Sequence, residues 1–417
     1  MEQPTAEKGA TSQPHAGLKR TLTLPYVVFY GLGVTVGAGI YVLIGEVIAR
    51  AGEFAPVSFL IAGLVMLFPA ACYAELTGRL PYAAAEAHFA EAGFGSRHLF
   101  LIVGLAVASV GIVSSAAIAH GAVGYLLQII DMPPTALLVV VILATGLVSG
   151  FGVRESIGLA GLLTLIEVSG LLAIIIGSAV TGADLAGQVV KSVPPSFSSV
   201  IWFGIISSSL LAFFAFIGFE DIPSIAEETI NPQKNLSRGI FITLALSLSI
   251  YVAVAIAALA SVPADEITAT EAPLALVFSA TTGLSPLSIT LIAIVATVNG
   301  IIVQILMAAR VLYGLAKRGS LPAFLAKVSG ATRAPVNATA LATAIVLLLA
   351  LTFPITQLAE WTSVITLTIF MTVCAALIRI KSSGQPAPEG TFIVPVWIPY
   401  CGILACGALL VSGTLMG

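Results

Sequence analysis

The sequence predicts an all-α polytopic membrane protein, and two observations carry that prediction. First, 58% of the 417 residues are hydrophobic and only 9% are charged, with a mean hydropathy of +1.08, whereas about 25% of residues are charged in water-soluble domains. Second, apolar runs of about 18 or more residues, long enough to cross a bilayer as helices, recur along the whole chain. The net charge of −3 gives no reason to expect a nucleic acid as partner.

Charged residues, proline and glycine divide these runs into about eleven spans. Their expected limits are residues 24–48, 55–78, 98–129, 134–151, 156–180, 202–228, 237–261, 285–314, 336–353, 358–379 and 393–415. The polar residues 1–23 lack an apolar core, so we expect a cytoplasmic tail and no cleavable signal peptide. With the N-terminus inside, all Lys and Arg except Arg50 and Lys191 fall in or beside cytoplasmic segments, as expected for a multi-pass protein of the cell membrane.

Two connecting segments carry predictions of their own. Residues 80–95 favour a helix with polar residues on one side, expected to lie along the cytoplasmic interface. Residues 261–280 are acidic and contain no basic residue, which predicts an external loop with a short helix, either part of an outer gate or a plain connector.

Signatures of cofactor, metal and catalytic sites are missing from the sequence. There is no Walker-type glycine loop, serine nucleophile elbow or two-histidine metal motif. Cys72, Cys374, Cys401 and Cys406 lie in or beside apolar spans without metal-ligand spacing, so we expect free thiols. A lone His120 in the third span is expected to be a hydrogen-bonded structural residue. The sequence therefore predicts neither an enzyme nor a bound cofactor.

The first span is interrupted by Gly31, Gly33, Gly37 and Gly39. Each glycine inside a helix costs roughly 1 kcal/mol relative to alanine, so we expect the helix to break, with residues 36–40 unwound. A break in the membrane is tolerated where protein or water satisfies the freed backbone groups, which makes this segment a candidate binding site for a carboxylate at the amide end of the outer half-helix. The alternative is a glycine motif that lets two helices pack closely.

A second interrupted span supports the binding interpretation. Within residues 205–228, Gly218, Glu220, Asp221 and Pro223 break an otherwise apolar run. Paired broken spans in corresponding positions of two halves indicate the binding site of a secondary transporter.

Several motifs, in order along the chain, resemble one family. They are residues 37–41 (GAGIY), 73–81 (YAELTGRLP), 152–156 (GVRES), 213–220 (FFAFIGFE), 226–236 (AEETINPQKNL) and 310–319 (RVLYGLAKRG). Together they resemble the amino acid, polyamine and organocation (APC) permeases. The resemblance implies a five-plus-five inverted repeat, with the first repeat at residues 24–180, the second at 202–380 and a further helix at 393–417. The family commonly has twelve spans, and this chain stops after the eleventh.

The resemblance also implies a site for a small amino acid or related amine. The carboxylate would meet the amides of Val36, Gly37, Ala38 and Gly39, and the ammonium would meet the carbonyls of Phe214, Ala215 and Ile217. Amides and carbonyls are opposite ends of the backbone dipole, which suits a zwitterion. Phe214 would close over the substrate or pack in the core, and Asn299 would contact the substrate or hydrogen-bond between helices.

Ionisable residues inside the membrane are costly, so each needs a reason. Glu75 lies four residues before Arg79 and is expected to be structural. Glu220 matches a family glutamate and is a candidate for proton-linked gating, with a hydrogen-bonded structural role as its alternative. Glu167 stands where certain relatives carry a lysine. We hypothesise that Glu167 couples transport to a proton or cation; the alternative is a protonated glutamate hydrogen-bonded to the first span.

Taken together, the sequence predicts a secondary active transporter that works by alternating access, with proton coupling or exchange. The alternative is a permease-like amino acid sensor that binds without transport. The small, apolar pocket residues favour a neutral substrate, and Glu167 leaves lysine-like or diamine substrates open. Membrane lipid is an expected partner; the oligomeric state is not determined by the sequence.

Overall fold

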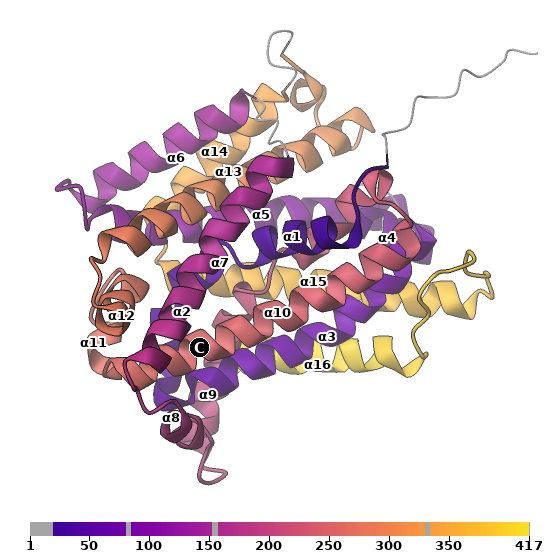
Figure 1. The fold of residues 1–417 in the computed structure, drawn as a ribbon. Coiled ribbons are helices and arrows are strands. Elements are labelled where there is room, and N and C mark those ends of the chain that lie inside the picture. The colour runs from indigo at the N-terminus through magenta and orange to yellow at the C-terminus, as the bar shows by residue number, and fades with distance from the viewer. Residues whose placement is uncertain (1–19, 81–84, 152–156, 330–333, 417) are drawn as a thin grey trace, which may run out of the picture.

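The computed structural model describes residues 20–80, 85–151, 157–329 and 334–416. The described residues form helices and connecting turns, with an isolated backbone bridge between Leu22 and Thr229. The predicted tail up to residue 19 and the motif at residues 152–156 lie outside the described residues. The all-α fold is confirmed (Figure 1).

The predicted spans appear as helices of the described chain. The first is divided into α1 (Leu24–Thr35) and α2 (Ala38–Ala51), and the sixth into α9 (Ser199–Phe214) and the 3-10 helix η2 (Phe219–Glu228). The others are α3 (Ala55–Arg79), α5 (Arg97–Leu126), α6 (Pro134–Gly150), α7 (Ile157–Val180), α10 (Pro232–Ser261), α13 (Leu287–Lys317), α14 (Val336–Thr352), α15 (Ile355–Ser382) and α16 (Trp397–Met416). Seven apolar stretches of the described chain are long enough to cross a bilayer, and shorter apolar helices accompany them.

Short elements link these helices. They are η1 (Gly52–Phe54), α4 (Ala85–Phe94), α8 (Leu185–Lys191), α11 (Ala264–Thr268), α12 (Pro273–Thr282) and η3 (Ala323–Ala326). The predicted interfacial helix appears as α4, but it is not a purely surface element, because it packs against α5 and α15 and buries Glu86 and Phe89. The acidic segment after α10 forms two short helices, and α12 packs against α7.

The long helices pack in pairs that join distant parts of the chain. The most extensive contacts run between α5 and α13 and between α3 and α10; α6 also packs along α14, and α2 along α9. In Figure 1, α1 and α2 lie in the middle of the molecule, with α7 crossing in front of them and α16 at the lower right. The segments at the breaks, residues 35–38 and 215–218, are buried in the protein, so their freed backbone groups do not face lipid tails.

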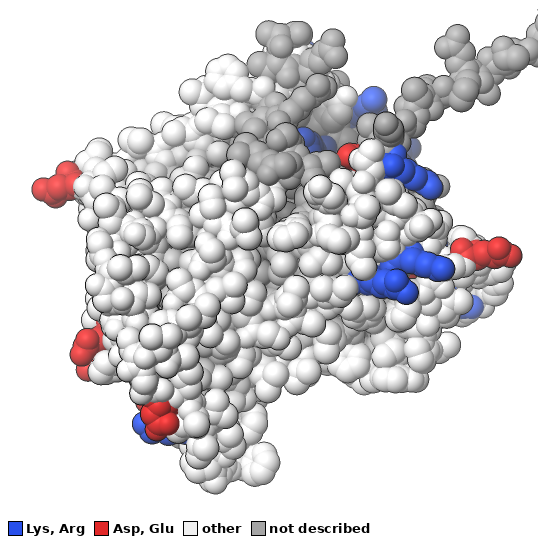
Figure 2. All heavy atoms as spheres, viewed as in Figure 1, with Lys and Arg blue, Asp and Glu red and all other residues white. Residues whose placement is uncertain are grey.

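Charge is segregated along the molecule. On the face drawn in Figure 2, most Lys and Arg atoms gather at the end near α4, while the opposite end carries mainly Asp and Glu. The wide middle zone of this face is almost free of charge, as expected for a surface in contact with hydrocarbon.

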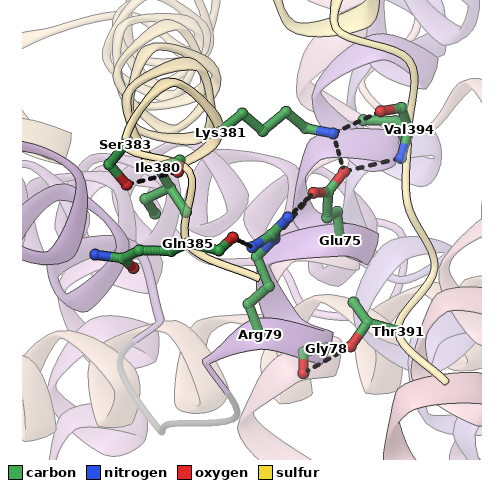
Figure 3. Close-up of polar contacts among 9 residues, drawn as sticks. All are labelled: Glu75, Gly78, Arg79, Ile380, Lys381, Ser383, Gln385, Thr391 and Val394. Carbon is green, nitrogen blue, oxygen red and sulfur yellow. Dashed lines mark hydrogen bonds and ion pairs between the residues drawn. The ribbon is translucent and has the colours of Figure 1, made fainter. Parts of the chain in front are cut away.

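A buried ion cluster ties α3 to α15 at the basic end (Figure 3). The Glu75 carboxylate accepts hydrogen bonds from Arg79 Nε at 2.9 Å and from the Val394 amide at 2.8 Å. Lys381 Nζ lies 2.7 Å from Glu75 Oε2 and donates to the Val394 carbonyl at 2.6 Å. Arg79 also donates to the Gln385 carbonyl. The structural role expected for Glu75 thus extends to a partner far along the chain, Lys381.

Candidate functional site

The first helix break is shorter than the sequence predicts. α1 ends at Thr35 and α2 already begins at Ala38, so only Val36 and Gly37 are irregular. The Val36 amide donates to the Leu32 carbonyl at 2.6 Å and therefore belongs to the end of α1. The first amides of α2 have no acceptor within their own helix, as at any helix start, and they carry the positive end of its dipole.

The second break is wider. α9 ends at Phe214, a turn follows, and Gly218 adopts a φ of 131° before η2 begins. The Gly218 amide donates to Glu220 Oε2 at 2.8 Å, so the glutamate caps the broken segment. The Ile217 amide donates to the Phe214 carbonyl at 3.2 Å.

The two breaks touch each other. A Cβ on Gly218 would collide with the carbonyl of Val34, and a Cβ on Gly39 would lie 2.7 Å from Ala215 Cα. Glycine is required at both positions because backbone meets backbone there. The glycines of the first span therefore serve close packing and helix interruption together, so the two interpretations of the sequence are not exclusive.

Tyr251 of α10 joins both breaks through one hydroxyl group. Its oxygen lies 2.6 Å from the Thr35 carbonyl and 2.7 Å from the Ala215 carbonyl. A phenol has a single proton to donate, so the two carbonyls share it. The Ala215 carbonyl, one of the groups expected to receive a substrate ammonium, already has this partner in the structure.

A cavity of about 570 Å³ lies against the breaks. It is lined by Tyr30, Gly33, Val34, Thr35, Gly37, Ala38, Gly39, Ser114, Ile118, Thr164, Glu167, Phe214, Ala215, Ile217, Asp221, Glu228, Ala296, Asn299, Gly300, Ile302, Val303, Gln304, Leu306, Met307 and Arg310. The main cavity, as we call this space, extends along α13 to Arg310, which is exposed. Its volume lies in the range of small-molecule sites in proteins.

The structure brings most of the predicted site residues together. Gly37, Ala38, Gly39, Phe214, Ala215, Ile217, Asn299 and Glu167 all line the main cavity. Val36 is buried and is not among the lining residues. Glu220 does not line the main cavity; with Asp221 and Glu86 it lines a second, smaller cavity.

The charged lining of the main cavity is mostly acidic. Glu167, Asp221 and Glu228 face it against the single basic residue Arg310. Glu167 is almost fully buried, and its Oε2 would lie 3.9 Å from a Cβ on Gly37, at the first break. The Tyr41 hydroxyl donates to the Glu167 carbonyl at 2.6 Å, and the Tyr125 hydroxyl donates to the Tyr41 carbonyl at 2.8 Å. These bonds connect α5 and α7 to α2 beside the break.

Sequence reasoning missed two residues of this region, Tyr251 and Glu86. Tyr251 interrupts an apolar run, as a buried residue with a polar tip does, but nothing local shows which carbonyls it reaches. Glu86 belongs to a helix whose polar residues predict an exposed face, yet it is only 7% exposed. No group of three or more His, Cys, Asp or Glu within the described residues has a geometry that could hold a metal ion. The four cysteines are free thiols, as predicted.

Comparison with known proteins identifies similar chains. Residues 22–417 match the sequence model of the family described as amino acid permease. A mitochondrial cationic amino acid transporter of Arabidopsis thaliana is 30% identical over 405 residues, covering 91% of this chain and 65% of that protein. A vacuolar cationic amino acid transporter of the same plant is 31% identical, covering 91% of this chain and 63% of that protein. The chain thus spans a little less than two thirds of the length of these relatives.

A bacterial relative is covered more completely. The branched-chain amino acid permease of Bacillus subtilis is 27% identical over 427 residues, covering 97% of this chain and 90% of that protein. These three relatives and five further similar proteins of the same two organisms are all named as transporters or permeases.

Proposed function

From the premise that this chain belongs to the amino acid permease family, we propose that it carries an amino acid across a membrane by alternating access. The observation that carries the proposal is the meeting of the two helix breaks at the wall of one cavity. A transporter needs such a site near the middle of the bilayer, reachable from one side at a time. Membrane association itself follows from the family and the apolar helices.

Backbone groups at the breaks provide the proposed contacts for a zwitterion. The amides of Gly37, Ala38 and Gly39, at the start of α2, would receive the carboxylate. Carbonyls of the second break, at Phe214, Ala215 and Ile217, would receive the ammonium. Because Val36 uses its amide within α1, the carboxylate contacts move one residue toward the start of α2. Asn299 of α13 is the proposed side-chain contact.

The acidic lining favours a cationic side chain on the substrate, in contrast to the neutral substrate that the apolar pocket residues favour. Three acidic residues and one arginine line the main cavity, and an excess of one sign of charge raises the local concentration of ligands of the opposite sign. Two of the relatives compared above are named for cationic amino acids and one for branched-chain amino acids.

We propose Glu167 and Glu220 as carboxylates that couple transport to a proton or cation. Glu167 faces the first break and Glu220 caps the second. Both breaks adjoin the proposed substrate site. Protonation of Glu167 or Glu220 can therefore shift the conformational equilibrium of the broken helices without direct contact between the carboxyl group and the substrate.

The repeat organisation and the orientation are part of the same proposal. Helices five spans apart pack against each other: α3 with α10, α5 with α13 and α6 with α14. This pattern supports a two-fold relation between residues 24–180 and 202–380. We propose that the basic end near α4 faces the cytoplasm, that the N-terminus lies on the same side, and that the protein resides in the cell membrane.

The test uses the purified chain in proteoliposomes with labelled lysine, leucine and putrescine. We expect labelled lysine to accumulate above empty vesicles, and excess unlabelled lysine or arginine to abolish the signal more effectively than leucine. Thermal-shift measurements with the same compounds report binding independently, because a ligand of the folded state raises its melting temperature. Binding without movement would identify a receptor and overturn the proposal.

The Glu167→Gln variant tests the coupling assignment. If Glu167 carries the coupling proton, the variant exchanges labelled substrate across the vesicle wall but no longer accumulates it when an inward proton gradient is imposed. If its pH-dependent accumulation equals that of the unmodified protein, Glu167 is not the coupling group. A selective loss of lysine binding, with leucine binding retained, would instead place Glu167 at the substrate side chain.

A further inference from the structure

A second cavity, which we call the acidic pocket, lies beside the main cavity. Its volume is about 40 Å³, and it is lined by Tyr73, Glu86, Val107, Val110, Gly111, Ile217, Glu220, Asp221, Gln304, Met307, Thr366, Ile369 and Phe370. A water molecule needs roughly 10 to 15 Å³ by the same measure, so the pocket has room for about three. Ile217, Asp221, Gln304 and Met307 also line the main cavity, so the two spaces share a wall.

Three carboxyl groups converge on this small space. Glu86 reaches it from α4, and Glu220 and Asp221 reach it from η2; no lysine, arginine or histidine is among the lining residues. Carboxylates that share a site cannot all be ionised without a large electrostatic cost. The pocket therefore needs a positive charge or a proton from its contents.

The polar contacts in the pocket leave capacity for such contents. The Tyr73 hydroxyl donates to Glu86 Oε1 at 3.4 Å, a long bond, and the Gly218 amide donates to Glu220 Oε2 at 2.8 Å. Thr366 of α15 lines the same space, is 2% exposed, and its hydroxyl has no protein partner. Buried hydroxyl groups are satisfied by protein or by bound water, so this orphan points to a small polar occupant.

Basic side chains on the elements around the pocket are not among its lining residues, and most of them have other partners. On α3 and α15, Arg79 and Lys381 bind Glu75. His88 of α4 and Arg318, the residue after α13, lie beside Glu91. Arg379 of α15 lies over the Phe94 ring of α4, and Arg310 faces the main cavity. The parts of α5, α13 and α15 that line the pocket contribute no ionisable residue.

Titration of Glu86 fits this setting. Burial raises the pKa of Glu86 to about 7, and the negative charge of Asp221 acts in the same direction. At neutral pH the group is therefore poised between its two protonation states, as a group that loads and releases a proton must be.

We propose that the acidic pocket is a proton-binding site in which Glu86, Asp221 and Glu220 share a proton whose loading and release are linked to substrate occupancy of the main cavity. Hydronium in the pocket gives its proton to one carboxylate and leaves as water, and release reverses this step. Since Asp221 belongs to η2 and Glu86 to α4, a shift of η2 on substrate binding changes their separation and hence the affinity for the proton. The inference rests on the proposed transport function.

The decisive experiment follows proton and substrate together. Protein in proteoliposomes that contain a fluorescent pH indicator is given labelled lysine, and the internal pH and the label are recorded in parallel. We expect substrate entry to be accompanied by a change of internal pH. In Glu86→Gln, the share of the substrate-linked pH change carried by the acidic pocket is expected to be lost, so the change falls at least about twofold even if Glu167 carries a proton as well. Exchange of labelled for unlabelled lysine should persist, because exchange needs no net proton movement.

A matched control uses Glu91 on the same helix. Glu91 pairs with Arg318 on the surface, outside the pocket, so Glu91→Gln should leave both signals unchanged. Unaltered proton movement in Glu86→Gln would overturn the inference. If the unmodified protein moves no labelled amino acid at all, the proposed function fails instead, so the two failures are distinguishable.

A second measurement needs no variant to fold. Lysine is added to the unmodified protein in weakly buffered detergent solution, and proton uptake or release is read with a soluble pH dye. We expect a change near pH 7 that is independent of sodium when sodium is replaced by choline. No proton exchange on binding, or an effect that follows sodium, would show that the pocket does not serve as a proton site.

Discussion

At the scale of single residues, the site depends on two glycines that have no side chain and on one tyrosine hydroxyl that donates where water otherwise would. Gly218 and Gly39 leave space where the two broken segments meet backbone to backbone. Tyr251 supplies the hydroxyl that two freed carbonyls share. In the interior of a membrane protein, where water is scarce, an unsatisfied backbone group costs several kcal/mol, so such residues decide whether a helix break can exist.

Replacing Gly218 with alanine should destabilise the protein. The new Cβ would meet the Val34 carbonyl, and a φ of 131° is strained for alanine, so we expect a loss of about 2 kcal/mol or more. The melting temperature in detergent measures the effect. The control is Gly314→Ala in α13, where a Cβ meets nothing within 4 Å; equal stability of the two variants would contradict the contact between the breaks.

Replacing Tyr251 with phenylalanine should remove the shared donor and leave two carbonyls to compete for water. We expect a stability loss of roughly 1–3 kcal/mol and slower substrate exchange in vesicles, since the breaks lose their common anchor. Tyr400→Phe on the exposed face of α16 is the control, because Tyr400 is 51% exposed. A Tyr251→Phe protein as stable and as fast as the control would rule out the bridging role.

At the scale of elements, the broken helices are held from outside by helices tied to one another. The Glu75 cluster fixes the end of α3 to α15 and to the segment that leads into α16 (Figure 3). Because α3 packs along α10 and contacts η2, the Glu75 cluster stabilises the helices that hold η2 beside both cavities.

Neutralising Glu75 should lower the stability of the protein. Glu75→Gln leaves Arg79 and Lys381 partly buried beside a neutral group, and removing one partner of a buried ion pair costs about 3–5 kcal/mol. The surface pair of Glu91 and Arg318 is the comparison, since Glu91→Gln should cost no more than about 1 kcal/mol. Melting temperatures of the two variants that differ little would argue against a structural role for the cluster.

At the scale of the whole molecule, two adjoining cavities share the wall formed partly by Ile217 and Asp221. The proposed substrate site on one side and the proposed proton site on the other would therefore act on the same broken helix. The pH dependence of folding reports on this arrangement, because a carboxyl group with a raised pKa binds a proton more tightly in the folded than in the unfolded state.

Stability should fall as pH rises through the range in which Glu86 titrates. Its pKa rises from 4.5 to about 7 on folding, so the folded state holds the extra proton between these values. The contribution of Glu86 is therefore most favourable below about pH 4.5, declines up to about pH 7, and amounts to roughly 3 kcal/mol at most. Melting temperatures of the unmodified protein should drop more over this range than those of Glu86→Gln; parallel curves would refute the shift.

The sequence by itself determined the membrane-spanning α-fold, the two interrupted spans and the residues at the breaks, because hydropathy and the helix propensity of glycine act locally along the chain. The helix-break signals and a family resemblance singled out Gly37, Phe214 and Asn299 as substrate contacts and Glu167 as a coupling group, and all four line the main cavity. The sequence overestimated the length of the unwound segment after α1, because the helix resumes at Ala38 and only Val36 and Gly37 lie between the two half-helices.

Only the tertiary structure decided which polar groups meet. Tyr251 reaches Thr35 across 216 positions of sequence, and Val394 reaches Glu75 across 319. The inward turn of Glu86 was equally invisible in the sequence, because it depends on how α4 packs against α5 and α15. Hydrogen bonds and ion pairs in a membrane interior are set by the packing of distant helices, whereas crossing the membrane is set by each segment's own apolar length.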